Sequence, residues 1–155
     1  MDVFDAANAL VANNGPAYEL VVMSATGKPF RAENGLILHP HTAFAQVTAL
    51  DTVIVPGGAG IRTEEIARPI ARWLQNCAPR TRRVASVCAG IYALGAAGLL
   101  EGRRATTRWR FVSDVSRKFV NVALEPDALF IRDGSFPEAF QCAGSATSGP
   151  LRARG

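Results

Sequence analysis

The residues best suited to chemistry in this sequence surround Cys88. A valine-containing run at 83–87 leads up to the cysteine, and small residues flank it at Ser86, Ala89 and Gly90. An apolar, alanine-rich segment with a helical pattern follows. We therefore expect a strand, a tight turn and a buried helix, with the thiol held at the turn, because small neighbours let the backbone bend sharply.

The spacing Ser86-x-Cys88-x-Gly90 has the same mechanics as the Gly-x-Ser-x-Gly turn of serine hydrolases, which exposes a nucleophile at the top of a sheet. The start of a helix also favours negative charge, which suits a thiolate. The other interpretation is a buried structural thiol, because free cysteine often behaves as a small hydrophobic residue.

A second candidate lies in the glycine-rich loop at 56–60, which directly follows the strand pattern at 52–55. No Gly-Lys-Ser/Thr follows, and the spacing does not fit Gly-x-Gly-x-x-Gly, so it is neither of these nucleotide-binding loops. Glycines at the end of a strand allow a bare backbone N–H to approach a reacting centre. The alternative is a loop that only needs positive φ angles.

Other residues with reactive or metal-binding side chains give weaker signals. His39 and His41 are two apart and would face one metal in an extended segment, but no acid or cysteine is close in sequence, and a solvated loop is the simpler interpretation. Cys77 and Cys142 complete an odd count of three cysteines without pair spacing, which argues against a disulfide framework and a zinc site.

Composition narrows the class of protein. The 155 residues suit one domain, and 48% hydrophobic with 19% charged residues allows a sizeable core. No apolar run approaches the roughly 20 residues that span a bilayer, and no signal peptide is present, so a cytoplasmic protein is expected. The net charge of +4 comes mainly from arginine, which fits contact with anions or nucleic acid but also an ordinary arginine-rich surface.

The periodicity predicts alternating helices and short apolar strands, and therefore an α/β sheet with helices on both faces. The strand at 18–23 is expected to be buried on both faces. The segment 135–155 has no sustained period and reads as an irregular or disordered tail. The predicted helices are 2–13, 63–76 (split by Pro69), 91–100 and 109–119; the predicted strands are 18–23, 36–38, 52–55, 83–87, 120–124 and 129–132.

Four segments, 51–58, 85–90, 96–107 and 124–134, resemble the ThiJ/PfpI superfamily within the class I glutamine amidotransferase-like fold. The similarity extends over about 2–134 and is closest to the N-terminal domain of AraC-type transcriptional regulators and to isonitrile-hydratase-like enzymes. It implies a flavodoxin-like, doubly wound, mostly parallel sheet. It also implies that 1–134 is a partial domain whose first strand, with its acidic residue, and whose closing helix are missing.

The resemblance also implies a site. Cys88 would be the elbow cysteine, and the N–H groups of Gly58 and Ala89 would hold an oxyanion. Gly57 and Arg108 would contribute to binding. Arg108 stands where the family usually has histidine, and an arginine cannot act as a base at neutral pH. No metal or cofactor is implied.

Three functions follow from this comparison. The first is a ligand-sensing domain derived from an AraC-type regulator, and the second is a cysteine-dependent hydratase or amidase that uses Cys88. The third is an inactive fragment with exposed strand edges. The expected partners are a small-molecule ligand and a second copy in a homodimer. No helix-turn-helix pattern follows 134, so we expect no direct DNA binding from this chain, and no membrane contact.

Overall fold

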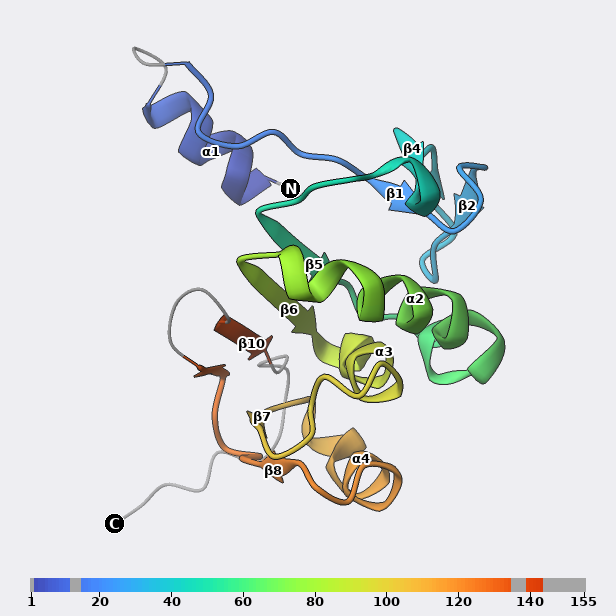
Figure 1. The fold of residues 1–155 in the computed structure, drawn as a ribbon, viewed down its shortest axis with the longest axis vertical. Coiled ribbons are helices and arrows are strands. Elements are labelled where there is room, and N and C mark those ends of the chain that lie inside the picture. The colour runs from blue at the N-terminus through green and yellow to red at the C-terminus, as the bar shows by residue number, and fades with distance from the viewer. Residues whose placement is uncertain (1, 12–14, 135–138, 144–155) are drawn as a thin grey trace. The chain divides into compact units, whose positions relative to one another are not determined.

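The computed structural model describes residues 2–11, 15–134 and 139–143. The chain divides into two compact units, Met1–Val47 and Thr48–Gly155. Figure 1 shows both units, with the larger elements labelled. The α/β class predicted from the sequence is confirmed, with parallel strand pairs in both units.

The first unit contains one helix and two small sheets. Strands β1 and β4 pair in parallel, and β2 and β3 form an antiparallel hairpin. Its elements are α1 (Asp2–Leu10), β1 (Met23–Ser24), β2 (Phe30–Arg31), β3 (Ile37–Leu38), β4 (Thr42–Ala43) and the 3-10 helix η2 (Phe44–Gln46).

The prediction of a strand at 18–23, buried on both faces, is wrong for most of that segment. Only Met23 belongs to a strand, and Tyr18 is 42% exposed. The amide N–H of Tyr18 donates to Asn8 Oδ1, and Asn8 Nδ2 donates to the Tyr18 carbonyl, both at 2.8 Å. These bonds tie Tyr18 to α1, so the backbone N–H and C=O of Tyr18 are satisfied without a sheet partner.

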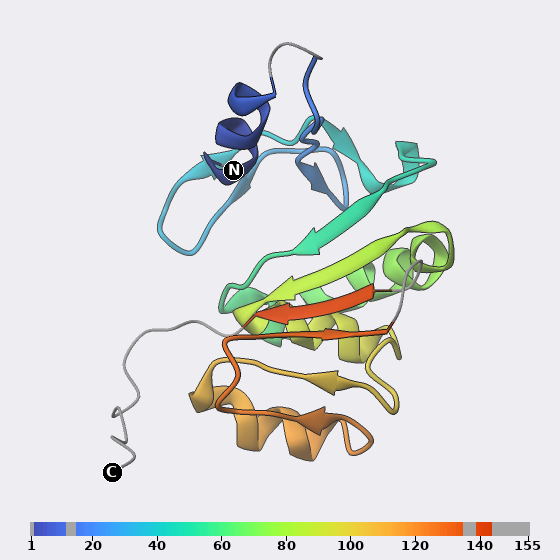
Figure 2. The same ribbon diagram turned by 90° about the vertical axis from the view of Figure 1, so that its left-hand side faces the viewer.

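The second unit is built on a four-stranded sheet in the order β5-β6-β10-β9. Strands β5 and β10 both run parallel to β6, and β9 is antiparallel to β10. Figure 2 shows these strands side by side with helices behind them. Among the described residues, β5 has a partner on one side only. The bounds are β5 (Thr52–Val55), β6 (Arg83–Val87), β9 (Phe130–Asp133) and β10 (Ala139–Ala143).

Strand β10 corrects the prediction that 135–155 is irregular throughout. Ala139 to Ala143 pair in register with Arg83 to Val87 of β6. Backbone hydrogen bonds between strands form with most residue types. A segment with few β-branched residues can therefore pair with the unpaired edge of a sheet. Residues 135–138 and 144–155 lie outside the described residues.

The helices that follow β5 and β6 pack on one another. Pro69 was predicted to split the first of them, yet the helix is continuous. Proline removes one N–H bond to the carbonyl four residues earlier, and both positions are exposed, so water can reach that carbonyl. The elements are η3 (Gly60–Arg62), α2 (Glu64–Cys77), η4 (Ala78–Arg80), η5 (Cys88–Gly90) and α3 (Ile91–Ala96).

The last part of the second unit has shorter elements than predicted. The helix expected at 109–119 is a 3-10 turn followed by a short helix, and Trp109, at its start, is 58% exposed. The strand expected at 120–124 is reduced to two residues, with Val120 79% exposed. The elements are β7 (Arg104–Ala105), η6 (Trp109–Phe111), α4 (Val112–Lys118) and β8 (Ala123–Leu124).

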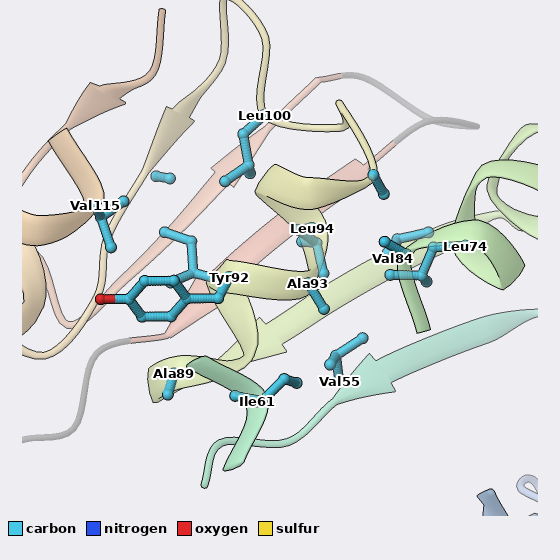
Figure 3. Packing of buried hydrophobic residues seen from close by; sticks show 14 of the residues in the cluster. Val55, Ile61, Leu74, Val84, Ala89, Tyr92, Ala93, Leu94, Leu100 and Val115 are labelled. Atoms are coloured by element: carbon cyan, nitrogen blue, oxygen red, sulfur yellow. The ribbon is translucent and has the colours of Figure 1, made fainter. Parts of the chain in front are cut away.

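The core lies between one face of this sheet and the helices. Val53 and Val55 of β5 and Val84 of β6 point into it and meet Leu74 and Leu94, as Figure 3 shows for four of these five. The alternate residues of the same strands are not buried; Ile54 is 44% and Val87 41% exposed. Helices were expected on both faces of the sheet, and within 48–134 the described helices pack on this face.

Candidate functional site

Cys88 lies where β6 ends and η5 and α3 begin, which confirms the predicted strand, turn and helix. Its φ angle is +55°, and it is the only non-glycine residue with positive φ among those that the structure describes. A side-chain-bearing residue in this region costs about 1–3 kcal/mol and persists only where its surroundings enforce it. The thiol is partly accessible, since Cys88 is of intermediate burial.

The glycine-rich loop after β5 supplies part of that enforcement. A Cβ atom on Gly57 would lie 3.0 Å from Cys88 Cβ and 3.1 Å from the Ala89 nitrogen. A Cβ atom on Gly90 would lie only 2.2 Å from the carbonyl oxygen of Val55. The loop and the turn can approach this closely only because both positions lack a side chain.

The positions predicted for an oxyanion pair lie in these two segments. Ala89 is 2% exposed and directly follows the cysteine, while Gly58 follows Gly57 in the loop. Because a Cβ atom on Gly57 would lie 3.1 Å from the Ala89 nitrogen, the loop packs closely against the turn at this position. That the Gly58 and Ala89 N–H groups act together on an oxyanion remains a prediction.

Thr107 fixes the turn from a third direction. Its hydroxyl donates to the Cys88 carbonyl at 3.0 Å, and the residue is 2% exposed. Thr107 is 19 residues from Cys88, and no local sequence pattern predicts this contact. Arg108 follows Thr107 directly and is half-buried. Its predicted role in binding stays a prediction.

The two histidines lie in the other unit. His41 Nδ1 accepts a hydrogen bond from the Val22 amide at 2.9 Å, and the His41 amide donates to the Val22 carbonyl at 2.8 Å. These two bonds join the residues that directly precede β1 and β4. Residues 48–155, which include Cys88, contain no histidine. Within the described ranges, no three His, Cys, Asp or Glu side chains gather as a metal site would require.

Cys77 has a different environment from Cys88. It ends α2 and packs against the core, and burial raises the pKa of its thiol. A thiol with a raised pKa is less often a thiolate and reacts more slowly with electrophiles. The side chain of Cys142, in β10, lies outside what the structure describes.

Next to the turn, α3 carries a buried tyrosine that the sequence analysis placed only in an apolar helix. The Tyr92 hydroxyl donates to Asp114 Oδ2 at 2.5 Å. Burial, together with that carboxylate, raises the pKa of Tyr92 to about 12, and the same hydrogen bond lowers the pKa of Asp114. Arg62, two residues beyond the Gly58–Gly60 part of the loop, stacks on this ring with its Cζ 5.8 Å from the ring centre.

The fold and this turn together define an α/β domain with a strained cysteine at a strand–helix junction. The model of the DJ-1/PfpI family matches residues 1–136. The chain therefore belongs to the DJ-1/PfpI family, as the resemblance to ThiJ/PfpI proteins predicted.

The sequence relatives include an uncharacterised protein, an enzyme and a transcriptional regulator. An uncharacterised protein from the cpoL 5′ region of Streptomyces lividans is 38% identical over 117 residues, covering 76% of this chain and 80% of that protein. Isonitrile hydratase of Pseudomonas putida is 42% identical over 83 residues, covering 54% and 36%. The HTH-type transcriptional regulator GbdR of Pseudomonas aeruginosa is 34% identical over 107 residues, covering 69% and 29%. The chain thus aligns with about a third of the hydratase and of the regulator.

Solved structures share the fold. An AraC family transcriptional regulator from Pseudomonas putida aligns with a TM-score of 0.71 at 24% identity, over 90% of this chain and 72% of that one. A ThiJ/PfpI family protein from Pseudomonas syringae aligns with a TM-score of 0.65 at 24% identity, over 83% of this chain and 51% of that one.

In the part of the chain described here, no helix has the length and apolar character to cross a membrane.

Proposed function

We propose that this chain is a ligand-sensing domain of the kind found in AraC-type regulators, and that the turn at Cys88 binds its ligand without turning it over. The observation that carries the proposal is the lack of any histidine in 48–155, combined with an arginine, Arg108, at the position directly after Thr107, whose hydroxyl contacts the turn. Nucleophilic cysteines are usually activated by a neighbouring base, and an arginine remains protonated at neutral pH.

The geometry supports binding as well. The Cys88 turn is held by Gly57, Gly90 and the Thr107 hydroxyl, so its backbone is fixed before a ligand arrives. A preorganised pair of N–H groups, here Gly58 and Ala89, suits a ligand with a carbonyl-type oxygen. Similarity to the regulator GbdR, and the fold shared with the AraC family regulator, favour the regulatory interpretation.

The test combines a screen with site-specific labelling. Small amides, carboxylates and isonitriles are screened for compounds that raise the melting temperature of the full chain. We expect a stabilising compound to slow carbamidomethylation of Cys88 by iodoacetamide while the rate at Cys77 stays unchanged. Cys77 is the internal control because it lies outside the turn. A screen in which no compound protects Cys88 would contradict the proposal.

A second function is favoured by one observation, the 42% identity to isonitrile hydratase over 83 residues. It predicts that a small isonitrile gains the elements of water and becomes the N-substituted formamide, with Cys88 as the nucleophile. We expect no formamide from the unchanged protein. Formation of formamide that disappears in Cys88→Ala would establish the enzyme and refute the proposal of binding without turnover.

The proposed function also carries the predicted partners. We expect a small molecule at the Cys88 turn, a homodimer in sedimentation experiments, and no sequence-specific gel shift from this chain alone.

A further inference from the structure

Three basic side chains in the second unit lie over the rings of Tyr92 and Phe111, and a fourth, Arg117, lies beside Asp114. We refer to Arg62, Arg110, Arg117 and Lys118 as the cationic cluster. Arg62 Cζ lies 5.0 Å from the centre of the Phe111 ring and also stacks on Tyr92. Arg110 Cζ lies 4.8 Å from the Phe111 ring centre, and Lys118 Nζ lies 5.6 Å from that of Tyr92. Cation–π contacts of this kind hold charged groups close to a surface.

The rings that carry these cations are themselves fixed. Tyr92 is 2% and Phe111 6% exposed, and the two rings meet edge to face with centroids 6.1 Å apart. Figure 3 shows the Tyr92 hydroxyl pointing toward the part of the chain that carries Val115, in α4. The buried rings of Tyr92 and Phe111 are therefore a rigid support for the cationic side chains. A rigid support reduces the conformational entropy that is lost when these side chains bind a ligand.

Positive charge in the cluster exceeds the negative charge that faces it. Asp114 lies among these cations, with Oδ2 3.9 Å from Arg62 Nη2 and Oδ1 3.6 Å from Arg117 Nη2. Both distances exceed those of a good hydrogen bond, and Oδ2 already accepts the Tyr92 hydroxyl. Glu64 also lies near Lys118, but its carboxylate pairs with Arg68.

The cations remain accessible. The side chain of Arg62 is 45% exposed and that of Arg117 is 79% exposed. Guanidinium groups bind oxyanions through two parallel N–H bonds, and a lysine adds a mobile point charge. One phosphate group carries about 1.5 to 2 negative charges at pH 7, which fits an excess of several cations better than a single carboxylate does.

We propose that the cationic cluster is a binding site for a phosphate-type oxyanion on a small molecule. The site uses Arg62, Arg117 and Lys118 as donors, with Tyr92 and Phe111 as their support. It is separate from the role assigned to Cys88 and stands or falls independently of it.

The test is calorimetric titration of the full chain with inorganic phosphate and pyrophosphate, with acetate as a monoanion for comparison. We expect pyrophosphate to bind with a Kd below about 1 mM. The double variant Arg117→Gln/Lys118→Gln should weaken binding by about tenfold or more, because two charge-assisted contacts are lost. The matched control Arg72→Gln/Arg80→Gln removes the same charge from exposed residues of α2 and η4. It should bind like the unchanged protein.

The outcomes separate the alternatives. Equal loss in the cluster and control variants would show a general charge effect and overturn the proposal, as would the absence of measurable binding. A short DNA duplex that binds through the cluster and is not displaced by pyrophosphate would assign the surface to nucleic acid instead. Unchanged pyrophosphate binding in Cys88→Ser is expected, and it distinguishes failure here from failure of the proposed sensing function.

Discussion

Burial and one hydrogen bond both raise the pKa of Tyr92. The side chain is 2% exposed, and its hydroxyl donates to Asp114. The neutral phenol is favoured in the folded protein, and its pKa is raised to about 12. The contribution to stability is therefore complete below pH 10, where unfolded tyrosine begins to ionise, and is lost as the pH rises toward 12.

This pKa can be measured directly because the chain has only two tyrosines, Tyr18 and Tyr92. In Tyr18→Phe, we expect the absorbance of tyrosinate to appear only as the pH approaches 12 or as the protein unfolds. Tyr92→Phe is the control and should lack this late transition. A midpoint near 10 in folded Tyr18→Phe would contradict the buried hydrogen bond to Asp114.

The same residue shows what a sequence pattern can predict at this scale. The apolar pattern of 91–100 placed Tyr92 in a buried helix, which is confirmed. Its partner Asp114 is 22 residues away, and no local period connects the two. Likewise, the small residues around Cys88 predicted the turn, whereas the Thr107 hydroxyl that supports it depends on tertiary structure.

At the scale of elements, the approach of η5, the turn that precedes α3, to β5 depends on Gly90 having no side chain. A Cβ on Gly90 would lie 2.2 Å from the Val55 carbonyl oxygen, and backbone atoms on both sides cannot yield easily. We expect Gly90→Ala to lower the free energy of unfolding by about 3 kcal/mol, measured by urea titration.

Gly60 provides a matched control for that substitution. A Cβ there would meet only Ile66 Cδ1, the end of a flexible side chain, at 2.8 Å. Gly60→Ala should therefore change the free energy of unfolding by less than about 1 kcal/mol. Equal effects of the two substitutions would mean that η5 and β5 are not packed as closely as the structure shows.

Strands with strong β-branched character were predictable, and those stabilised mainly by their neighbours were not. The segment Thr52–Val55 was identified from its own residues, and its bounds are confirmed. Strand β10 was not predicted because its composition resembles that of a loop and because its partner β6 is distant in sequence. The segment at 18–23 was misassigned for the opposite reason, since an apolar run does not become a buried strand without partners on both sides.

At the scale of the whole molecule, acid should weaken the fold. Several carboxyl groups have lowered pKa values because a neighbour donates a hydrogen bond to the charged form. A lowered pKa contributes stability above the unfolded value near 4, and that contribution is lost as the pH falls through the folded value. The pairs are Asp51 with Arg82, Glu64 with Arg68, Asp114 with Tyr92 and Glu125 with Arg104.

Asp51 has the largest expected share of this effect, since its pKa is lowered to about 2. We expect the free energy of unfolding, from urea titrations at several pH values, to decrease steadily between about pH 4 and pH 2. Asp51→Asn should flatten part of this decrease, and high salt should do the same because these pairs are exposed. A stability independent of pH in this range would contradict the assigned hydrogen bonds.

Trp109 gives the protein an optical reporter of its own. It is 58% exposed and directly follows Arg108, while the only other tryptophan, Trp73, packs against the core. An exposed indole emits at longer wavelength than a packed one. Small solutes quench the exposed indole and hardly reach the packed one. A ligand bound near Arg108 would therefore shift the emission of Trp109 to shorter wavelength and reduce its quenching, while the emission of Trp73 stays constant. The measurement needs no attached dye.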